Sequence, residues 1–159
     1  MWNQPIRRSP SKRTLPLTYG VVLLAAFGLC VSAASSQNQA DRKTKAFHLT
    51  KDCSGFKGGV GSYCTIRSSN VKALKPGSQI FYFQAANPSA LDSDVAIYVK
   101  RGTVATGHCL LHLGTGLGLC TISDGTGTLA GFRLRANVKA DASNPGLWHW
   151  DGTYSFAKR

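Results

Sequence analysis

Glutamate is absent from all 159 residues of this chain, so its seven acidic residues are all aspartates. Acids are also few beside bases: 19 Lys and Arg give a formal net charge of +12. The absence of glutamate excludes every acid–base mechanism in which a glutamate side chain transfers the proton. The basic excess favours anionic partners in general, but the basic residues are scattered, which is typical of a positive surface rather than a specific nucleic-acid site.

Helical periodicity is missing after residue 34, where no stretch keeps an apolar period of 3.6 residues. Apolar and polar residues alternate instead, which is typical of strands with one buried face. The chain therefore predicts an all-β fold, a small antiparallel closed β-barrel of about eight strands, with an immunoglobulin-like sandwich as the rival. The expected strands are residues 46–51, 65–67, 79–85, 94–101, 103–113, 119–123, 129–139 and 147–156.

Long hydrophobic runs are limited to one, Leu15–Ala34, which follows a basic segment without acids. This order and the small residues at its end predict a cleaved secretory signal peptide over 1–33, then a polar flexible tether over 34–45 and the barrel domain over 46–159. The alternative is an uncleaved anchor, but Tyr19–Ala34 would span only about 24 Å of a core of roughly 30 Å. Cleavage would lower the net charge to +8 and leave no membrane span.

Cysteines are few, and removal of the signal peptide would leave four in two C-x10-C pairs. Four cysteines allow three pairings, and the glycine-rich segments between them favour the local ones, Cys53–Cys64 and Cys109–Cys120. Each such disulfide would stabilise the fold by roughly 3 kcal/mol. A zinc site is disfavoured because the short C-x2-C pairs of such sites are missing. Disulfides indicate a secreted or periplasmic protein.

The segment from Ile122 to Phe132, followed by an alternating strand, a Pro-Gly turn and an aromatic last strand, resembles the barrel of allene oxide cyclases and dirigent proteins. Gly125, Gly127, Leu129 and Gly131 fit that superfamily's glycine pattern, with Asp124 where a glycine is usual. The resemblance covers about the last 80 residues and extends to bacterial secreted proteins with a barrel-like domain of unassigned activity. It implies a barrel with a lumen.

The resemblance carries over no catalytic residue. The allene oxide cyclase site needs a buried glutamate, which this chain lacks. Dirigent proteins use acidic residues and an arginine in the lumen, and the only pool for such a set is Asp92, Asp94, Asp151, Arg133 and Arg135.

Two histidine patterns are candidates for a metal site or an acid–base pair. His108 and His112 are separated by roughly 13 Å along a strand, too far to share a metal ion. His149 and Asp151 fall on one strand face and could form a polar pair, without a serine or cysteine nucleophile beside them. We therefore predict no catalytic residue, no metal site and no cofactor.

An aromatic row gives the candidate ligand-binding residues Trp148, Trp150, Tyr154 and Tyr82. Core packing is the favoured interpretation of this row, since the alternating His, Asp, Thr and Ser suit solvent better. The function predicted is a non-catalytic binding module for a small apolar ligand or an envelope component, with a small apolar ligand or an anionic surface as partner. The alternative is a cyclase, isomerase or dirigent-like enzyme that uses the lumen.

Export generates the first testable prediction. We expect the mature N-terminus between Ala33 and Gln37, because small residues follow the apolar run there. N-terminal sequencing of secreted protein measures it. An intact Met1 on protein recovered from a membrane fraction would instead establish an anchor.

Overall fold

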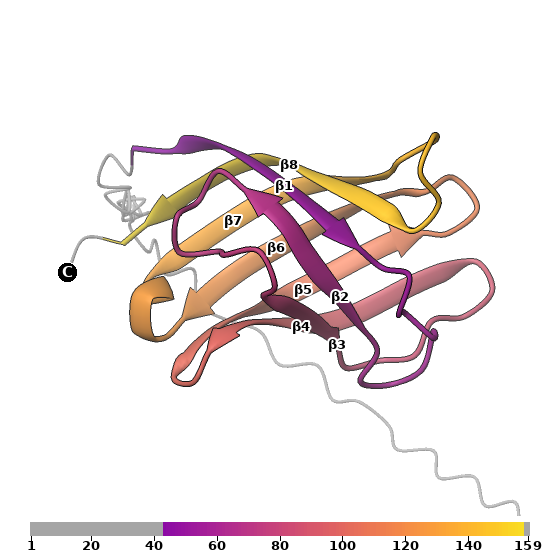
Figure 1. Cartoon of the computed structure of the whole chain (residues 1–159), viewed down its shortest axis with the longest axis horizontal. Helices are drawn as coiled ribbons and strands as arrows, with labels where there is room; N and C mark the ends of the chain where they lie inside the picture. Colours follow the sequence, from indigo (N-terminus) through magenta and orange to yellow (C-terminus); the bar gives the residue numbers. More distant parts are fainter. Residues whose placement is uncertain (1–42, 158–159) are drawn as a thin grey trace, which may run out of the picture. The chain divides into compact units, whose positions relative to one another are not determined.

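The computed structural model describes residues 43–157, and these form a closed barrel of eight antiparallel strands in which β8 pairs with both β7 and β1 (Figure 1). This confirms the all-β barrel predicted from the sequence.

The predicted signal peptide lies outside the described residues, where it stays a prediction. No helix within residues 43–157 is long and apolar enough to cross a membrane. The strands are β1 Lys45–Asp52, β2 Tyr63–Ser69, β3 Gln79–Tyr82, β4 Ala90–Lys100, β5 Thr103–His112, β6 Leu117–Gly125, β7 Phe132–Ala140 and β8 Leu147–Phe156, with one 3-10 turn, Gly127–Leu129.

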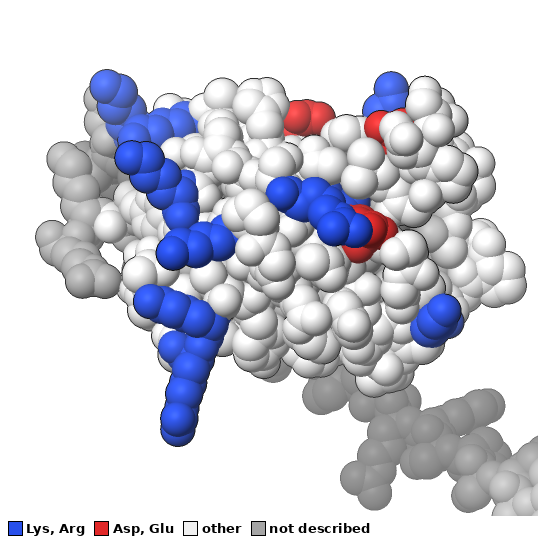
Figure 2. All heavy atoms as spheres, in the orientation of Figure 1, with Lys and Arg blue, Asp and Glu red and all other residues white. Residues whose placement is uncertain are grey.

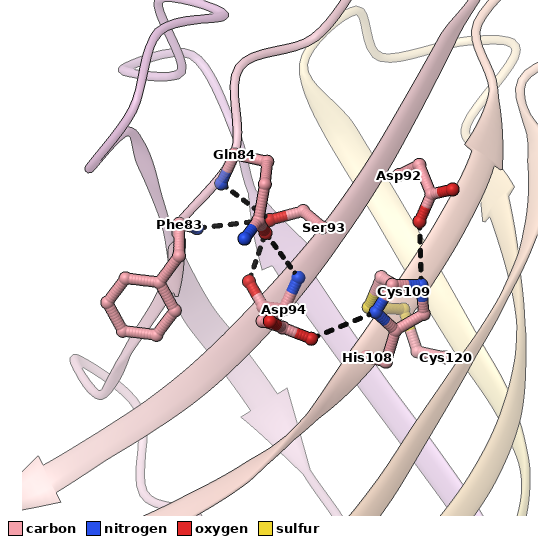
Figure 3. A network of polar contacts seen from close by, with 8 residues as sticks. All are labelled: Phe83, Gln84, Asp92, Ser93, Asp94, His108, Cys109 and Cys120. Carbon is pink, nitrogen blue, oxygen red and sulfur yellow. Dashed lines mark hydrogen bonds and ion pairs between the residues drawn. A yellow bond between two sulfur atoms is a disulfide. The ribbon is translucent and has the colours of Figure 1, made fainter.

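The third and fourth strands differ from the predicted bounds. β3 ends at Tyr82 rather than at residue 85, and β4 begins at Ala90 rather than at residue 94. Side-chain hydrogen bonds are added where the pairing of β3 with β4 ends. The Ser93 hydroxyl accepts hydrogen bonds from the backbone N–H groups of Phe83 and Gln84, and the Gln84 side chain accepts one from the Asp94 N–H (Figure 3). Sequence alternation does not reveal these hydrogen bonds, because in each of them a single side chain from a distant residue bonds to a backbone N–H group.

The barrel interior is a packed core. Along β7 the apolar residues are buried and Arg133, Arg135, Asn137 and Lys139 are exposed, as the alternation predicts. Large side chains from several strands fill the middle, among them Phe47, Phe132 and Trp150, each 0% exposed. An eight-stranded barrel is just wide enough for its own side chains. A ligand therefore has access only at an end of the barrel.

Both local disulfides predicted from the sequence are present. Cys53–Cys64 joins the chain just after β1 to β2, with its Cα atoms 4.3 Å apart. Cys109–Cys120 links directly paired residues of β5 and β6 across 4.1 Å. Disulfides persist in oxidising compartments, so this pairing agrees with export from the cytoplasm.

At Gly152 the backbone of β7 lies where a side chain of β8 would stand. A Cβ atom added there would lie 2.0 Å from the Arg135 carbonyl oxygen and 2.7 Å from the Ala136 Cα atom. Both neighbours are backbone atoms of the paired strand, so neither can rotate away. The barrel closes in this form because residue 152 has no side chain.

Replacing Gly152 with alanine should therefore destabilise the barrel by about 1–3 kcal/mol, the usual cost of overpacking. Chemical denaturation of the variant beside the wild type measures the change in the free energy of unfolding. Gly114→Ala is the matched control, because a Cβ there meets nothing within 4 Å and its loss of stability should be negligible. Equal stabilities for the two variants would contradict the close packing of β8 on β7.

Candidate functional site

A lysine side chain lies inside the apolar barrel. Lys51 continues the inward alternation of Phe47 and Leu49 on β1, and only 1% of it is exposed. The other buried polar residues in the described part of the chain carry hydroxyl groups: Ser78, Ser93, Thr103 and Ser155. A buried charge is costly unless it is paired, so this position requires a physical explanation.

The neighbours of the Lys51 amine are weak partners for a cation. Its Nζ atom donates a hydrogen bond to the Tyr82 hydroxyl and lies 3.8 Å from the Cys64 sulfur atom. No ion pair among residues 43–157 involves Lys51. The amine therefore has neutral neighbours only, within the described residues.

Aromatic rings surround the same amine. The Nζ atom lies 5.0 Å from the centre of the Tyr82 ring, 5.1 Å from that of Trp150 and 5.9 Å from that of Trp148. The faces of such rings attract cations and offset part of the desolvation cost of the ammonium. Phe56 packs edge-on against Tyr82, with ring centres 5.4 Å apart, and covers the group from the Cys53–Cys64 loop.

Burial changes the ionisation of both polar groups. Desolvation lowers the pKa of Lys51 from 10.5 to about 7 and raises the pKa of Tyr82 above its ordinary value. Both shifts favour the neutral form, because a charge is poorly solvated inside the barrel. Near neutral pH the site thus offers an amine that is partly unprotonated beside a hydroxyl that keeps its proton.

A small pocket lies against this amine at the end of the barrel where β1 and β5 finish. Its walls are Phe56, Leu91, Leu111, Leu113 and Trp148, together with the Cys53–Cys64 disulfide, and Lys51 and Tyr82 supply the polar groups. The cavity volume is about 40 Å³, a few times the roughly 10–15 Å³ that one water molecule needs. Apolar walls that end on one or two polar groups are the usual form of a small-ligand site.

Two of the four aromatic residues predicted to bind a ligand line this pocket, and a third lies behind the Lys51 amine. Trp148 and Tyr82 line it, and Trp150 contacts the Lys51 amine from the core. Tyr154 does not join them, because it packs on Phe47 and Phe132 towards the other end of β8, with ring centres 6.1 and 6.0 Å away. Since Trp150 is 0% exposed, its own packing matches the core interpretation.

The structure does not bring His149 and Asp151 together as a polar pair. Asp141 contacts His149 at 2.9 Å, and His48 contacts Asp151 at 2.7 Å. Residues directly opposite on paired strands lie closer than residues two apart along one strand, which explains the contact of Asp151 with His48. Asp141 directly follows β7 and contacts His149 from the connection between β7 and β8. His48 and Asp151 are such a directly opposed pair on β1 and β8.

His108 belongs to an ion-pair network on the outer face of β4 and β5. It contacts Asp92 at 2.7 Å and Asp94 at 3.1 Å (Figure 3). The hydrogen bond that the His108 ring donates to the Asp94 carboxylate, followed by the charge of Asp92, raises the pKa of His108. His112 is exposed on the same strand, and no group of three or more metal-binding residues occurs within residues 43–157.

The acids and arginines considered for a dirigent-like lumen set all have exposed side chains. Asp92 and Asp94 lie on the outer face of β4, Arg133 and Arg135 on that of β7, and Asp151 on that of β8. That set is therefore wrong for the barrel interior. On the face shown in Figure 2, basic side chains are spread widely, with most of them at the left end and few acids among them.

Lys51 is the residue that sequence reasoning missed. A signal for it existed: in Phe47-His-Leu-Thr-Lys51 the apolar positions alternate, and the lysine occupies the next inward position. A lysine in that position at a strand end is usually solvated, so the pattern alone does not distinguish the two cases.

Comparisons with known proteins return no relative of this chain. No family model matches it, and neither the curated proteins nor the solved structures give a match. The resemblance to allene oxide cyclase and dirigent barrels thus stays a prediction, while the closed barrel itself is described directly.

The lowered pKa of Lys51 predicts how stability depends on pH. Between pH 7 and 10 the unfolded chain keeps the lysine proton that the folded chain loses, so the free energy of unfolding should rise with pH by up to about 1.4 kcal/mol per unit. Below pH 7 both states are protonated and the full cost of burial is present. Above pH 10 the raised pKa of Tyr82 acts in the opposite direction.

Lys51→Met removes the titrating group, so its stability relative to the wild type should be greatest below pH 7 and should shrink as the pH rises towards 10. Denaturation of both proteins at several pH values measures this difference. Lys139→Met, at an exposed position, is the control and should show no such dependence. A difference between Lys51→Met and wild type that does not vary with pH would refute the lowered pKa.

Proposed function

We propose that this protein is a secreted or periplasmic, non-catalytic binding module that takes one end of a small apolar ligand into the pocket beside Lys51. The observation that carries the proposal is an apolar pocket that ends on a buried amine without a carboxylate partner among the described residues. A ligand with one polar atom would give that amine a partner and give the apolar walls a surface to cover.

The packing of the barrel limits the ligand. Because Trp150, Phe47 and Phe132 fill the centre, the ligand enters only from the end of the barrel. With a cavity volume of about 40 Å³, the enclosed part is a short chain of a few atoms, and any remainder projects into solvent. Burying its apolar surface stabilises the complex at about 25 cal/mol per Å², which favours weak binding of short ligands.

Location and family are part of the same proposal. Two disulfides and a predicted signal peptide support export to the periplasm or the exterior. The closed barrel supports the resemblance to the allene oxide cyclase and dirigent superfamily only at the level of architecture. The basic surface is the feature that would suit an anionic component of the envelope.

A second candidate function is isomerisation or cyclisation in the same pocket. The observation that favours it is the pairing of Lys51, with its pKa near 7, and the protonated Tyr82 hydroxyl. An amine with that pKa is suited to act as a general base, and a phenol beside it is suited to donate a proton. Turnover abolished by both Lys51→Met and Tyr82→Phe would replace the binding proposal by this one.

Binding is tested with butan-1-ol, a short neutral ligand that cannot react with an amine. Titration followed by NMR should shift the indole and methyl signals of Trp148, Leu111 and Leu113, which line the pocket. Leu113→Trp should fill the mouth of the pocket and weaken binding by roughly tenfold or more, the effect of losing about 1.4 kcal/mol.

Leu117→Trp is the matched control, since Leu117 is 50% exposed and does not line the pocket. Its binding should equal that of the wild type. Shifts confined to residues elsewhere on the barrel, or equal weakening in both variants, would show that the pocket is not a ligand site.

A further inference from the structure

We infer that the ligand is a short aliphatic aldehyde and that Lys51 holds it covalently as an imine. This inference rests on the proposed function, because it names the ligand class of the same pocket. It goes further in assigning Lys51 the role of a nucleophile that captures a carbonyl carbon.

The first support is the position of the amine. Lys51 is 1% exposed, and it is one of the residues that line the pocket, so the cavity is the space from which a ligand would approach its amine. Lysines desolvated in apolar pockets are the ones that form Schiff bases with carbonyl ligands. The other lysines among residues 43–157 are all exposed, so they lack this environment.

The second support is the absence of a carboxylate near the amine within the described residues. A carboxylate would hold the lysine as an ammonium ion, which has no lone pair for attack. Here the hydrogen-bond neighbours are the Tyr82 hydroxyl and the Cys64 sulfur atom, both neutral. The lowered pKa of Lys51 agrees with this setting.

The third support is the chemistry of the pocket walls. Phe56, Leu91, Leu111 and Leu113 suit an alkyl chain, and the lining residues with polar side-chain atoms are Lys51, Tyr82 and Trp148. A carboxylic acid would bring a full charge with two oxygens into these walls, and desolvation of such a pair can exceed its attraction. An aldehyde carries one neutral oxygen, for which the Tyr82 hydroxyl is a single sufficient donor.

The reaction needs no further reagent. The Lys51 lone pair attacks the carbonyl carbon, and one amine proton moves to the carbonyl oxygen to give a carbinolamine. Tyr82 then donates its proton to that hydroxyl as the carbon–oxygen bond breaks, and water leaves. The second amine proton returns to the Tyr82 oxygen, so one C=N bond has replaced one C=O bond and one water is released.

The experiment traps the imine by reduction: the secreted protein is treated with butanal and cyanoborohydride near neutral pH. Peptide mass spectrometry then locates the modified lysines. At that pH the unprotonated fraction of Lys51 exceeds that of an exposed lysine by roughly a thousandfold. We therefore expect one butyl group at Lys51, at a yield at least about tenfold above that at any other lysine. Tyr82→Phe should slow the trapping by roughly tenfold or more, because the proton donor is lost.

Three comparisons separate this inference from the proposed function. If butan-1-ol binds and butanal labels only exposed lysines, the imine is overturned and the binding module stands. If neither ligand engages the pocket, both proposals fail. If sodium butyrate competes with butan-1-ol for the pocket while butanal gives no Lys51 adduct, the ligand is an acid and the imine is again overturned.

Variants give the matched controls for trapping. Lys139→Met removes an exposed lysine of β7 and should leave the adduct at Lys51 unchanged. Lys51→Met should abolish the selective adduct, because the amine that forms it is gone. The residues of the pocket walls are unchanged in this variant. The wild-type peptide map decides the question by itself if Lys51→Met does not fold.

Discussion

The cost of placing an amine inside an apolar barrel is the constraint on which the pocket depends. Lys51 takes up the inward position that follows Phe47 and Leu49 on β1, so the strand alternation directs it into the core. Its amine is accommodated by the Tyr82 hydroxyl and by ring faces, not by an opposite charge among the described residues. Neutral surroundings favour the unprotonated form of the Lys51 amine. The packing of this end of the barrel therefore determines whether the amine can act as a base or a nucleophile.

The rest of the barrel supports this arrangement. Cys53–Cys64 ties the loop that carries Phe56 to β2, so that Phe56 covers Tyr82 at the pocket. Trp150 blocks the path into the centre and places its ring beside the same amine. At β7 and β8 the missing side chain of Gly152 lets the two strands approach closely. The filled interior is consistent with a short pocket at the end of the barrel instead of an open lumen.

Much of the fold could be predicted from the sequence. The alternation of Phe132, Leu134, Ala136 and Val138 gave the correct faces of β7, and the C-x10-C spacing led to the correct disulfides. The bounds of β3 and β4 could not be predicted, because they depend on distant partners: the Ser93 hydroxyl bonds to the backbone just after β3, and β4 begins early because Ala90–Ser93 pair with β5.

The site was predicted only in part. Tyr82, Trp148 and Trp150 were identified as aromatic candidates, since large rings on inward faces are visible in the sequence. Lys51 was missed because burial of a lysine depends on residues from several strands, which a single strand pattern does not contain. The pairing of His149 and Asp151 was wrong because their partners Asp141 and His48 come from other segments.

The ionisation of Lys51 tests the account most directly. NMR titration of the Lys51 side chain, with the carbon next to Nζ as the reporter, follows the protonation of this one amine in the folded protein. Burial of this amine predicts a midpoint near pH 7, well below the ordinary lysine value of about 10.4. A midpoint at pH 10 or above would show an ordinary ammonium ion and would contradict the neutral, carbonyl-reactive amine at the centre of the account.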